Sequence, residues 1–286
     1  MAAERKPVTG KRRSMVIGID RGVYWLSKHW LAVFNTLALI YVGLPILAPA
    51  LMNAGLETPA RVIYRIYSPL CHQMTQRSFF LFGDQYAYPR AIAGTELTPI
   101  ETYVGDIPEF DNVDPDDWPA FFTAARRYLG DEQLGYKIAL CQRDIGIYLF
   151  VLVGGLLYAM LRNRINIKPL PILLFVVIGL APIAIDGFSQ LFSYWSTPLD
   201  GSDPTGLAAT IQSIIPLRES TPMMRALTGA WFGLALVWLA YPHVNESMKG
   251  TERELGAKLR RLDNPELASA QQEAAVEKPD SSRPDS

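Results

Sequence analysis

Residues Trp30–Met52 read WLAVFNTLALIYVGLPILAPALM and hold no charged side chain. The hydrocarbon core of a bilayer is about 30 Å thick, and a helix of about 20 residues crosses it. The run therefore predicts a transmembrane helix, which Pro45 and Pro49 are expected to kink near its far end. Residues 48–50, Ala-Pro-Ala, resemble a signal-peptidase site. We expect no cleavage there, because the apolar run is longer and its leader more extended than in a cleaved signal.

Further uncharged runs follow at Ile145–Leu161, Pro169–Ile185 and Ala226–Tyr241. Each is slightly shorter than a full span and must recruit flanking polar residues into the membrane or its interface. In hydrocarbon only helices and closed barrels satisfy their backbone polar groups, and no run alternates as barrel strands do. The sequence predicts an all-α integral membrane bundle over residues 30–242. Its transmembrane helices are expected at about 30–52, 141–161, 169–190 and 224–242.

The distribution of charge predicts the orientation of these helices. The basic segment 1–29, the loop Arg162–Lys168 and the tail 243–286 fall on one side of the membrane. The opposite side receives residues 84–136, which hold eleven acidic and three basic side chains. Because cytoplasmic loops are enriched in lysine and arginine, we expect a multi-pass protein of the cell membrane with both termini in the cytoplasm. The tail is predicted to be a charged helix followed by a disordered end beyond Asn264.

The segments between the first two spans are expected to lie at the outer face. Pro59–Tyr67 has the pattern of a short amphipathic helix, and residues 59–82 are predicted to be interfacial or partly re-entrant. Residues 84–136 form a long acidic insertion, which we expect to be a solvated outward loop. Within it, Asp116 or Asp117 is suited to cap a helix over Trp118–Leu129.

Composition excludes two other classes of protein. The chain has 286 residues, a formal net charge of −1 and no basic run interleaved with aromatic residues. A nucleic-acid partner is therefore not expected. The two cysteines, Cys71 and Cys141, are too few for a disulfide-dense secreted scaffold.

The residues with reactive or charged side chains gather at the outer ends of the predicted helices. They are Cys71, His72, Arg77, Cys141, Arg143, Asp144, Asp186, Gln190, Arg218 and Arg225. Ionisable groups at the ends of spans are costly and tend to face the interior of the bundle, so they are functional candidates by default. Helical spacing places Cys141 and Asp144 on one face, and it places Asp186 and Gln190 on another.

Several ordered motifs resemble one protein family. They are Cys71-His72-Gln73, Arg77-Ser78-Phe79, residues 141–148 (CQRDIGIY), residues 185–190 (IDGFSQ), residues 218–221 (REST) and residues 225–229 (RALTG). Over about Tyr64 to Gly233 the chain resembles the predicted membrane proteins grouped as domain of unknown function 2085. The resemblance implies a small polytopic helical protein and brings no assigned activity.

The chain departs from the family pattern in two places. Such proteins commonly carry a second cysteine three residues after the first in the Cys-x-Arg motif, where this chain has Asp144. The segment between Gly83 and Lys137 looks like a long insertion. Exchange of cysteine for aspartate keeps an anionic metal ligand but abolishes thiol redox chemistry at that position, so it favours a metal site over a Cys-x-x-Cys redox pair.

We therefore predict a metal site of Cys71, His72, Cys141 and Asp144 that binds zinc or another divalent transition metal. Thiolate, imidazole and carboxylate are the ligand types that zinc uses. Adjacent cysteine and histidine ligands are awkward to bring onto one ion. A disulfide between Cys71 and Cys141 is the main alternative, because both are expected to face an oxidising compartment. Free thiols are the third alternative.

Three functions are compatible with these features. The first is a metal-dependent membrane enzyme for a lipid-linked or anionic substrate, with Asp186 as acid or base beside Gln190, and with Arg218 and Arg225 holding the anion. Asp186 can instead form an ion pair with Arg143, Arg218 or Arg225 that locks the bundle. The second function is a structural or accessory subunit that binds a membrane protein partner. The third is a small transporter, against which the lack of an inverted repeat argues.

Overall fold

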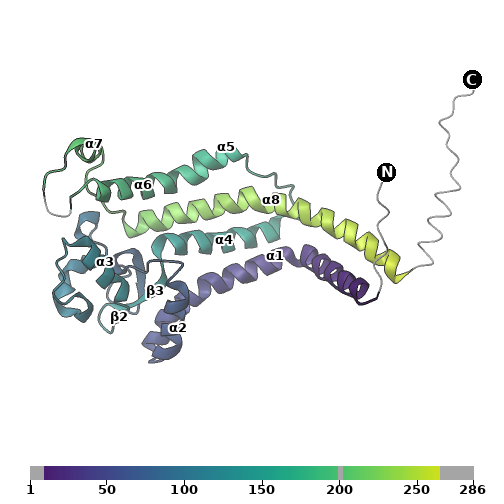
Figure 1. Ribbon diagram of the computed structural model, residues 1–286, viewed down its shortest axis with the longest axis horizontal. Helices are drawn as coiled ribbons and strands as arrows, with labels where there is room; N and C mark the ends of the chain where they lie inside the picture. The colour runs from purple at the N-terminus through teal and green to yellow at the C-terminus, as the bar shows by residue number, and fades with distance from the viewer. Residues whose placement is uncertain (1–9, 199–201, 265–286) are drawn as a thin grey trace, which may run out of the picture. The chain divides into compact units, whose positions relative to one another are not determined.

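The computed structural model of the protein describes residues 10–198 and 202–264. In this part of the chain, four helices are long and apolar enough to cross a membrane, which confirms the predicted number of spans. They are α1 (Gly10–Asn53), α4 (Gln142–Leu161), the continuous helix formed by α5 (Ile172–Leu174), η6 (Phe175–Leu180) and α6 (Ala181–Trp195), and α8 (Pro222–Asp263). Shorter helices are α2 (Glu57–Tyr67) and α7 (Gly206–Ile214) (Figure 1).

The chain divides into two compact units. Among the described residues, 34–198 and 202–241 belong to the larger unit, which contains the helical bundle, and 10–33 and 242–264 belong to the smaller unit. In the smaller unit the start of α1 and the end of α8 are joined by ion pairs of Asp20 with Lys258 and of Arg21 with Asp263. α8 continues without interruption through Pro242, so the charged helix predicted after the last span is an extension of that span.

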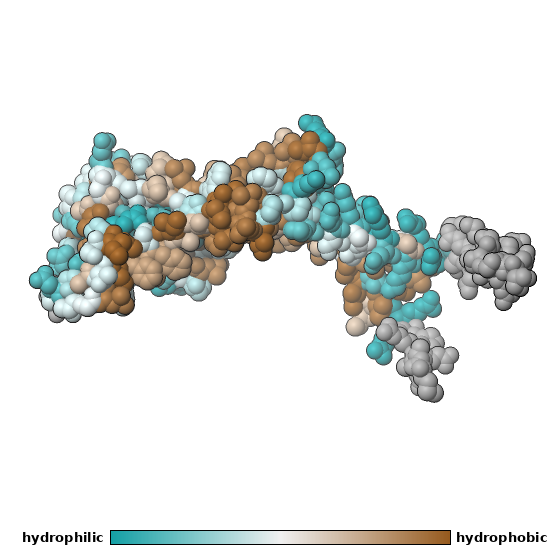
Figure 2. Space-filling view, turned by 90° about the horizontal axis from the view of Figure 1, so that it is seen from above, coloured by the Kyte–Doolittle hydropathy of each residue, from teal (hydrophilic) through white to brown (hydrophobic). Residues whose placement is uncertain are grey.

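Glycines allow α4 and α8 to approach each other closely. A Cβ atom on Gly146 of α4 would collide with the backbone of Ala226, and one on Gly229 of α8 would collide with the carbonyl oxygen of Arg143. Without a hydrophobic driving force in lipid, such backbone contact is a main source of helix association. Figure 1 shows α8 between α4 and α6 in the larger unit. The apolar side chains on the outside of these helices form the brown surface seen in Figure 2.

One turn of the third span departs from α-helical geometry. η6 is a π-helix, in which backbone hydrogen bonds join residues five apart instead of four. Gly179 in this segment lies against Ala235 of α8. The carbonyl oxygen of Ile178 accepts a hydrogen bond of 2.5 Å from the indole nitrogen of Trp231. A neighbouring helix thus supplies a hydrogen bond to an irregular turn, as a lipid environment requires.

The acidic segment between the first two spans is folded and is not an open loop. It contributes to a three-stranded antiparallel sheet in the order β1-β3-β2. The strands are β1 (Ser78–Leu81), β2 (Gly130–Asp131) and β3 (Gly135–Cys141). α3 (Trp118–Arg127) packs beside the sheet, and the Asp117 side chain accepts a hydrogen bond from the amide of Ala120, which confirms the predicted cap. The fold is mostly helical, as predicted, but the sheet was not expected.

A separate hydrophobic core stabilises this part of the chain, which we call the sheet region (residues 75–141). Its buried side chains are Phe80, Tyr88, Ile100, Ile107, Phe110, Phe121, Ala124, Ala125, Tyr128 and Leu134. No pattern in the sequence indicated this core, because nine of its ten residues lie in segment 84–136, dispersed among eleven acidic residues without a helical or strand period. The sheet region lies at the end of the larger unit where α4 and α8 begin (Figure 1).

A buried lysine ties the sheet region together. Lys137 on β3 is fully buried, and its Nζ donates hydrogen bonds to the carbonyl oxygens of Gln73, Ala125 and Arg126 at 2.6, 3.2 and 3.0 Å. The contacts connect β3 to the last turn of α3 and to the segment that follows α2. Burial, which disfavours the charged form, lowers the pKa of Lys137 from 10.5 to about 7.

This pKa predicts how stability depends on pH. Between pH 7 and 10.5 the unfolded chain binds more protons at Lys137 than the folded chain does, so the free energy of unfolding should rise with pH. The rise is at most about 1.4 kcal/mol per pH unit. We expect the difference in thermal midpoint between the wild-type protein and Lys137→Met to widen from pH 7 to pH 9. Lys137→Gln provides a second comparison, and parallel pH profiles in all three proteins would contradict the prediction.

Candidate functional site

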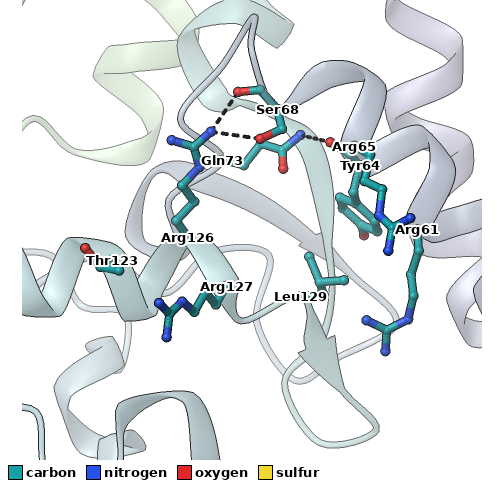
Figure 3. Close-up of a pocket in the computed structure, with 9 residues that line it drawn as sticks. All are labelled: Arg61, Tyr64, Arg65, Ser68, Gln73, Thr123, Arg126, Arg127 and Leu129. Atoms are coloured by element: carbon teal, nitrogen blue, oxygen red, sulfur yellow. Dashed lines mark hydrogen bonds between the residues drawn. The ribbon is translucent and has the colours of Figure 1, made fainter.

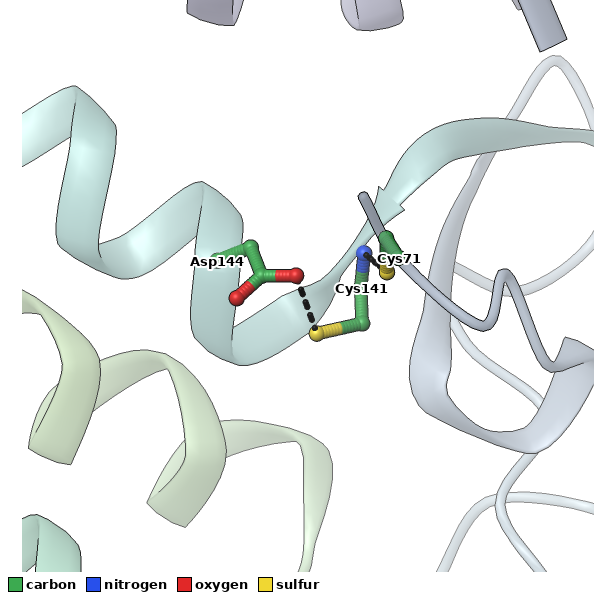
Figure 4. A group of neighbouring side chains, drawn as sticks. All are labelled: Cys71, Cys141 and Asp144. Atoms are coloured by element: carbon green, nitrogen blue, oxygen red, sulfur yellow. Dashed lines mark hydrogen bonds between the residues drawn. The ribbon is translucent and has the colours of Figure 1, made fainter. Parts of the chain in front are cut away.

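The end of β3 and the start of α4 bring the two cysteines together. Cys141 is the last residue of β3 and precedes the first turn of α4, which contains Asp144. Cys71 comes from the segment after α2. The amide of Cys141 donates a hydrogen bond of 3.2 Å to the sulfur of Cys71, and the thiol of Cys141 donates one of 3.1 Å to the carboxylate of Asp144 (Figure 4).

Cys71, Cys141 and Asp144 form a compact set of metal-ligand types. Their candidate ligand atoms, two sulfurs and a carboxylate oxygen, all lie within 4.8 Å of one another. Both cysteines are free thiols. Two thiolates and a carboxylate suit a divalent transition metal, and three protein ligands leave a fourth position open, as in catalytic zinc sites. The donor set present therefore fits the predicted metal.

His72, predicted as a fourth ligand, is not part of this compact set. It lines the same cavity, of about 280 Å³, but its side chain is exposed whereas those of its neighbours Cys71 and Gln73 are buried. Gln73 has a φ of 53°, in the left-handed region. Its side-chain amide donates hydrogen bonds of 2.9 Å to the carbonyl oxygens of Tyr64 and Ala139, which keep the chain in this turn.

The two thiols have different acidities. When its single hydrogen turns from Asp144 to the Cys71 sulfur, the Cys141 thiol makes a hydrogen bond that stabilises the Cys71 thiolate and so lowers the pKa of Cys71. The same bond and burial raise the pKa of Cys141, and the nearby Asp144 carboxylate adds to this effect. Cys71 is therefore the sulfur that is more readily deprotonated, and a metal ion would have to displace the proton of Cys141 to bind both thiolates.

Three arginines line the same cavity as the cysteines. Arg77, Arg143 and Arg225 contribute to its wall, and each forms an ion pair with a buried carboxylate that does not line the cavity. Arg143 forms an ion pair of 2.5 Å with Asp186, which is 5% exposed. Arg77 and Arg225 pair with Glu219 at 3.0 and 2.9 Å. The arrangement places positive charge beside the sulfur and carboxylate ligands.

Asp186 is surrounded by donors. In addition to Arg143, it accepts hydrogen bonds from Arg218 at 3.3 Å and from the Ser220 hydroxyl at 2.6 Å. The ion-pair alternative considered from the sequence therefore occurs, with Arg143 and Arg218 as partners. Arg225, the third candidate partner, instead donates to Gln190 at 2.8 Å and to Glu219. No observation tests Asp186 as an acid or base, and that role stays a prediction.

Glu219 is a central residue that sequence reasoning missed. Its side chain is 1% exposed, and besides two arginines it accepts hydrogen bonds from the hydroxyl of Tyr194 at 2.7 Å and the amide of Gln190 at 3.5 Å. A signal was present, because Glu219 is the only acidic residue between Asp203 and Glu246. A lone carboxylate next to a membrane span needs a cationic partner.

The network predicts unequal effects for two carboxylates. Glu219→Ala would leave the buried guanidinium of Arg225 without its carboxylate, at a cost of about 3–5 kcal/mol in the free energy of unfolding. Glu57→Ala removes an exposed pair with Arg61 and should cost less than about 1 kcal/mol. Unfolding in mild detergent, followed by intrinsic fluorescence, measures both. Equal stability of the two variants would show that the Glu219 network contributes little.

Comparison with known proteins agrees with the resemblance seen in the motifs. Residues 133–239 match the sequence profile of the predicted membrane protein family DUF2085. The uncharacterised protein MJ1492 of Methanocaldococcus jannaschii is 26% identical over 223 residues, which cover 76% of this chain and 93% of that protein. No solved structure matches the chain. The predicted family is thus confirmed: over residues 133–239 the chain carries the DUF2085 domain of predicted membrane proteins, and MJ1492 is a distant relative.

Proposed function

We propose that Cys71, Cys141 and Asp144 bind one divalent transition metal, zinc in the first instance, and that the protein is a metal-dependent membrane enzyme for an anionic or lipid-linked substrate. One observation carries the proposal. Three ligand atoms of the right chemistry lie within 4.8 Å of one another, in a cavity whose wall also contains three arginines. When bound, such a metal supplies Lewis acidity and lowers the pKa of a coordinated water.

The arginines of the cavity wall would bind and orient the anionic group of the substrate. Guanidinium groups match phosphate and carboxylate oxygens with paired hydrogen bonds. Of the two arginines predicted for this role, Arg225 lines the cavity and Arg218 does not. Arg143 lines it as well and takes the place proposed for Arg218. Asp186 then acts as a positioning residue that holds Arg143 in the wall, with Gln190 doing the same for Arg225.

A second function keeps support from the same cysteines. Free thiols whose sulfurs lie close together can form a disulfide in an oxidising compartment. In that state the protein would be a structural or accessory subunit stabilised by the disulfide. The acidic surface of the sheet region would then bind a membrane protein partner. The measurement below separates this alternative from the metal site.

The metal content of detergent-purified protein tests the proposal. We expect about one zinc or other transition metal per chain, and its loss in Cys71→Ser, Cys141→Ser and Asp144→Asn, because each removes one of few anionic ligands. His72→Ala should retain the metal. The matched control is Asp116→Asn, which alters an exposed carboxylate of the sheet region. Elemental mass spectrometry gives the metal and its ratio to protein.

Two outcomes would contradict the metal site. Wild-type protein without metal, whose thiols become alkylated only after reduction, would establish the disulfide instead. Metal that persists in all three ligand variants would place the ion elsewhere. For the enzyme proposal, hydrolysis of an anionic test ester should vanish in Cys71→Ser. Arg143→Gln should weaken it by raising KM while the metal content is kept.

A further inference from the structure

A second cavity, of about 510 Å³, lies between α2 and the end of α3. It shares only Gln73 with the lining of the cysteine cavity. Four arginines line it: Arg61 and Arg65 of α2, and Arg126 and Arg127 of α3. Figure 3 shows that the two pairs enter from different elements, with Leu129 between them. The cysteine site and its arginine network do not use any of these side chains.

The positive charge of this cavity is only partly compensated. Arg61 pairs with Glu57 at 3.1 Å, and Arg126 is held by the carbonyl and hydroxyl oxygens of Ser68 at 2.9 and 2.8 Å. Within residues 10–198 and 202–264, neither Arg65 nor Arg127 has an acidic partner, and both are exposed. The uncompensated positive charge of Arg65 and Arg127 is therefore available to bind an anion.

The surrounding composition makes this surplus unusual. Segment 84–136 carries eleven acidic and three basic residues, and two of those three, Arg126 and Arg127, line this one cavity. They meet two more arginines that come from a different part of the chain. Guanidinium groups hydrogen-bond phosphate oxygens in pairs, so a phosphate group, with several such oxygens, is an anion that a cavity lined by four arginines suits.

The exposed face of α2 next to the arginines is apolar. Val62 and Ile66 of α2 are 48% and 57% exposed, and Leu70, in the turn that follows the helix, is 58% exposed. Val62 and Ile66 each follow an arginine, so about 100° of helical turn separates the charged face of α2 from the apolar face. α2 begins four residues after the end of α1, the first candidate span, which places it next to a membrane boundary. A helix with these two faces is typical of the plane of the membrane surface.

We infer that the four-arginine cavity binds the phosphate of an anionic phospholipid whose acyl chains lie along the apolar face of α2. The charged face supplies paired hydrogen bonds to the headgroup, and Val62, Ile66 and Leu70 contact the chains. Free phosphate offers the same headgroup chemistry but no acyl chain. The site is independent of the proposed metal centre, because no ligand of that centre lines the cavity.

Native mass spectrometry of the full-length protein in detergent tests the inference, with phosphatidylglycerol and inorganic phosphate as separate probes. We expect bound phosphatidylglycerol on the wild-type protein and no bound phosphate at the same concentration. Arg65→Gln/Arg127→Gln should weaken lipid binding about tenfold or more, as lost charge-assisted hydrogen bonds imply. Ile66→Gln should also weaken it. Arg253→Gln/Arg260→Gln, which removes two exposed charges from α8, is the matched control and should bind as the wild type does.

The outcomes are distinct. Equal lipid binding by the wild type and by Arg65→Gln/Arg127→Gln would overturn the inference, as would the same loss in the α8 control. Phosphate binding that equals or exceeds lipid binding would show that the cavity takes free phosphate and would overturn the assignment to lipid. Thermal midpoints confirm that the variants are folded. Metal content should be unchanged in them, so failure of this site and failure of the metal site can be told apart.

Discussion

Two buried carboxylates, Asp186 and Glu219, are the constraint on which the candidate site depends. They hold four arginines (Arg77, Arg143, Arg218 and Arg225) that come from three different parts of the chain. Breaking a buried pair leaves an uncompensated charge, which is why these contacts restrict how the ends of the helices can be arranged. Neither carboxylate lines the cavity, whereas three of the four arginines form part of its wall.

The balance of charge connects this network to the cysteines. Four guanidinium groups exceed two carboxylates by two positive charges, and the Asp144 carboxylate and a Cys71 thiolate would offset them. If a divalent metal binds and the proton of Cys141 is released, one positive charge is left over. An anionic substrate would compensate it. The proposed metal and the proposed substrate charge are therefore consistent with each other, although they were inferred from different residues.

The sheet region supplies the other half of the site. Pairing of β1 with β3 places Ser78 opposite Cys141, and the hydrogen bonds of Lys137 and Gln73 fix the segment that carries Cys71. The sheet region thus positions Cys71 against the first turn of α4. The sheet region also brings Arg126 and Arg127 close to α2, so it contributes to both cavities.

The sequence by itself determined the four spans, the resemblance to the family and most of the candidate metal-ligand set. Long uncharged runs, ordered motifs and the spacing of Cys141 and Asp144 are local properties, and local properties survive in any arrangement of the chain. Tertiary structure alone decided that His72 lies outside the compact set of Cys71, Cys141 and Asp144, that Glu219 rather than Asp186 pairs with Arg225, and that residues 84–136 fold around a core of their own. These depend on contacts between residues distant in sequence, where a hydrogen bond or a buried side chain leaves no periodic pattern to read.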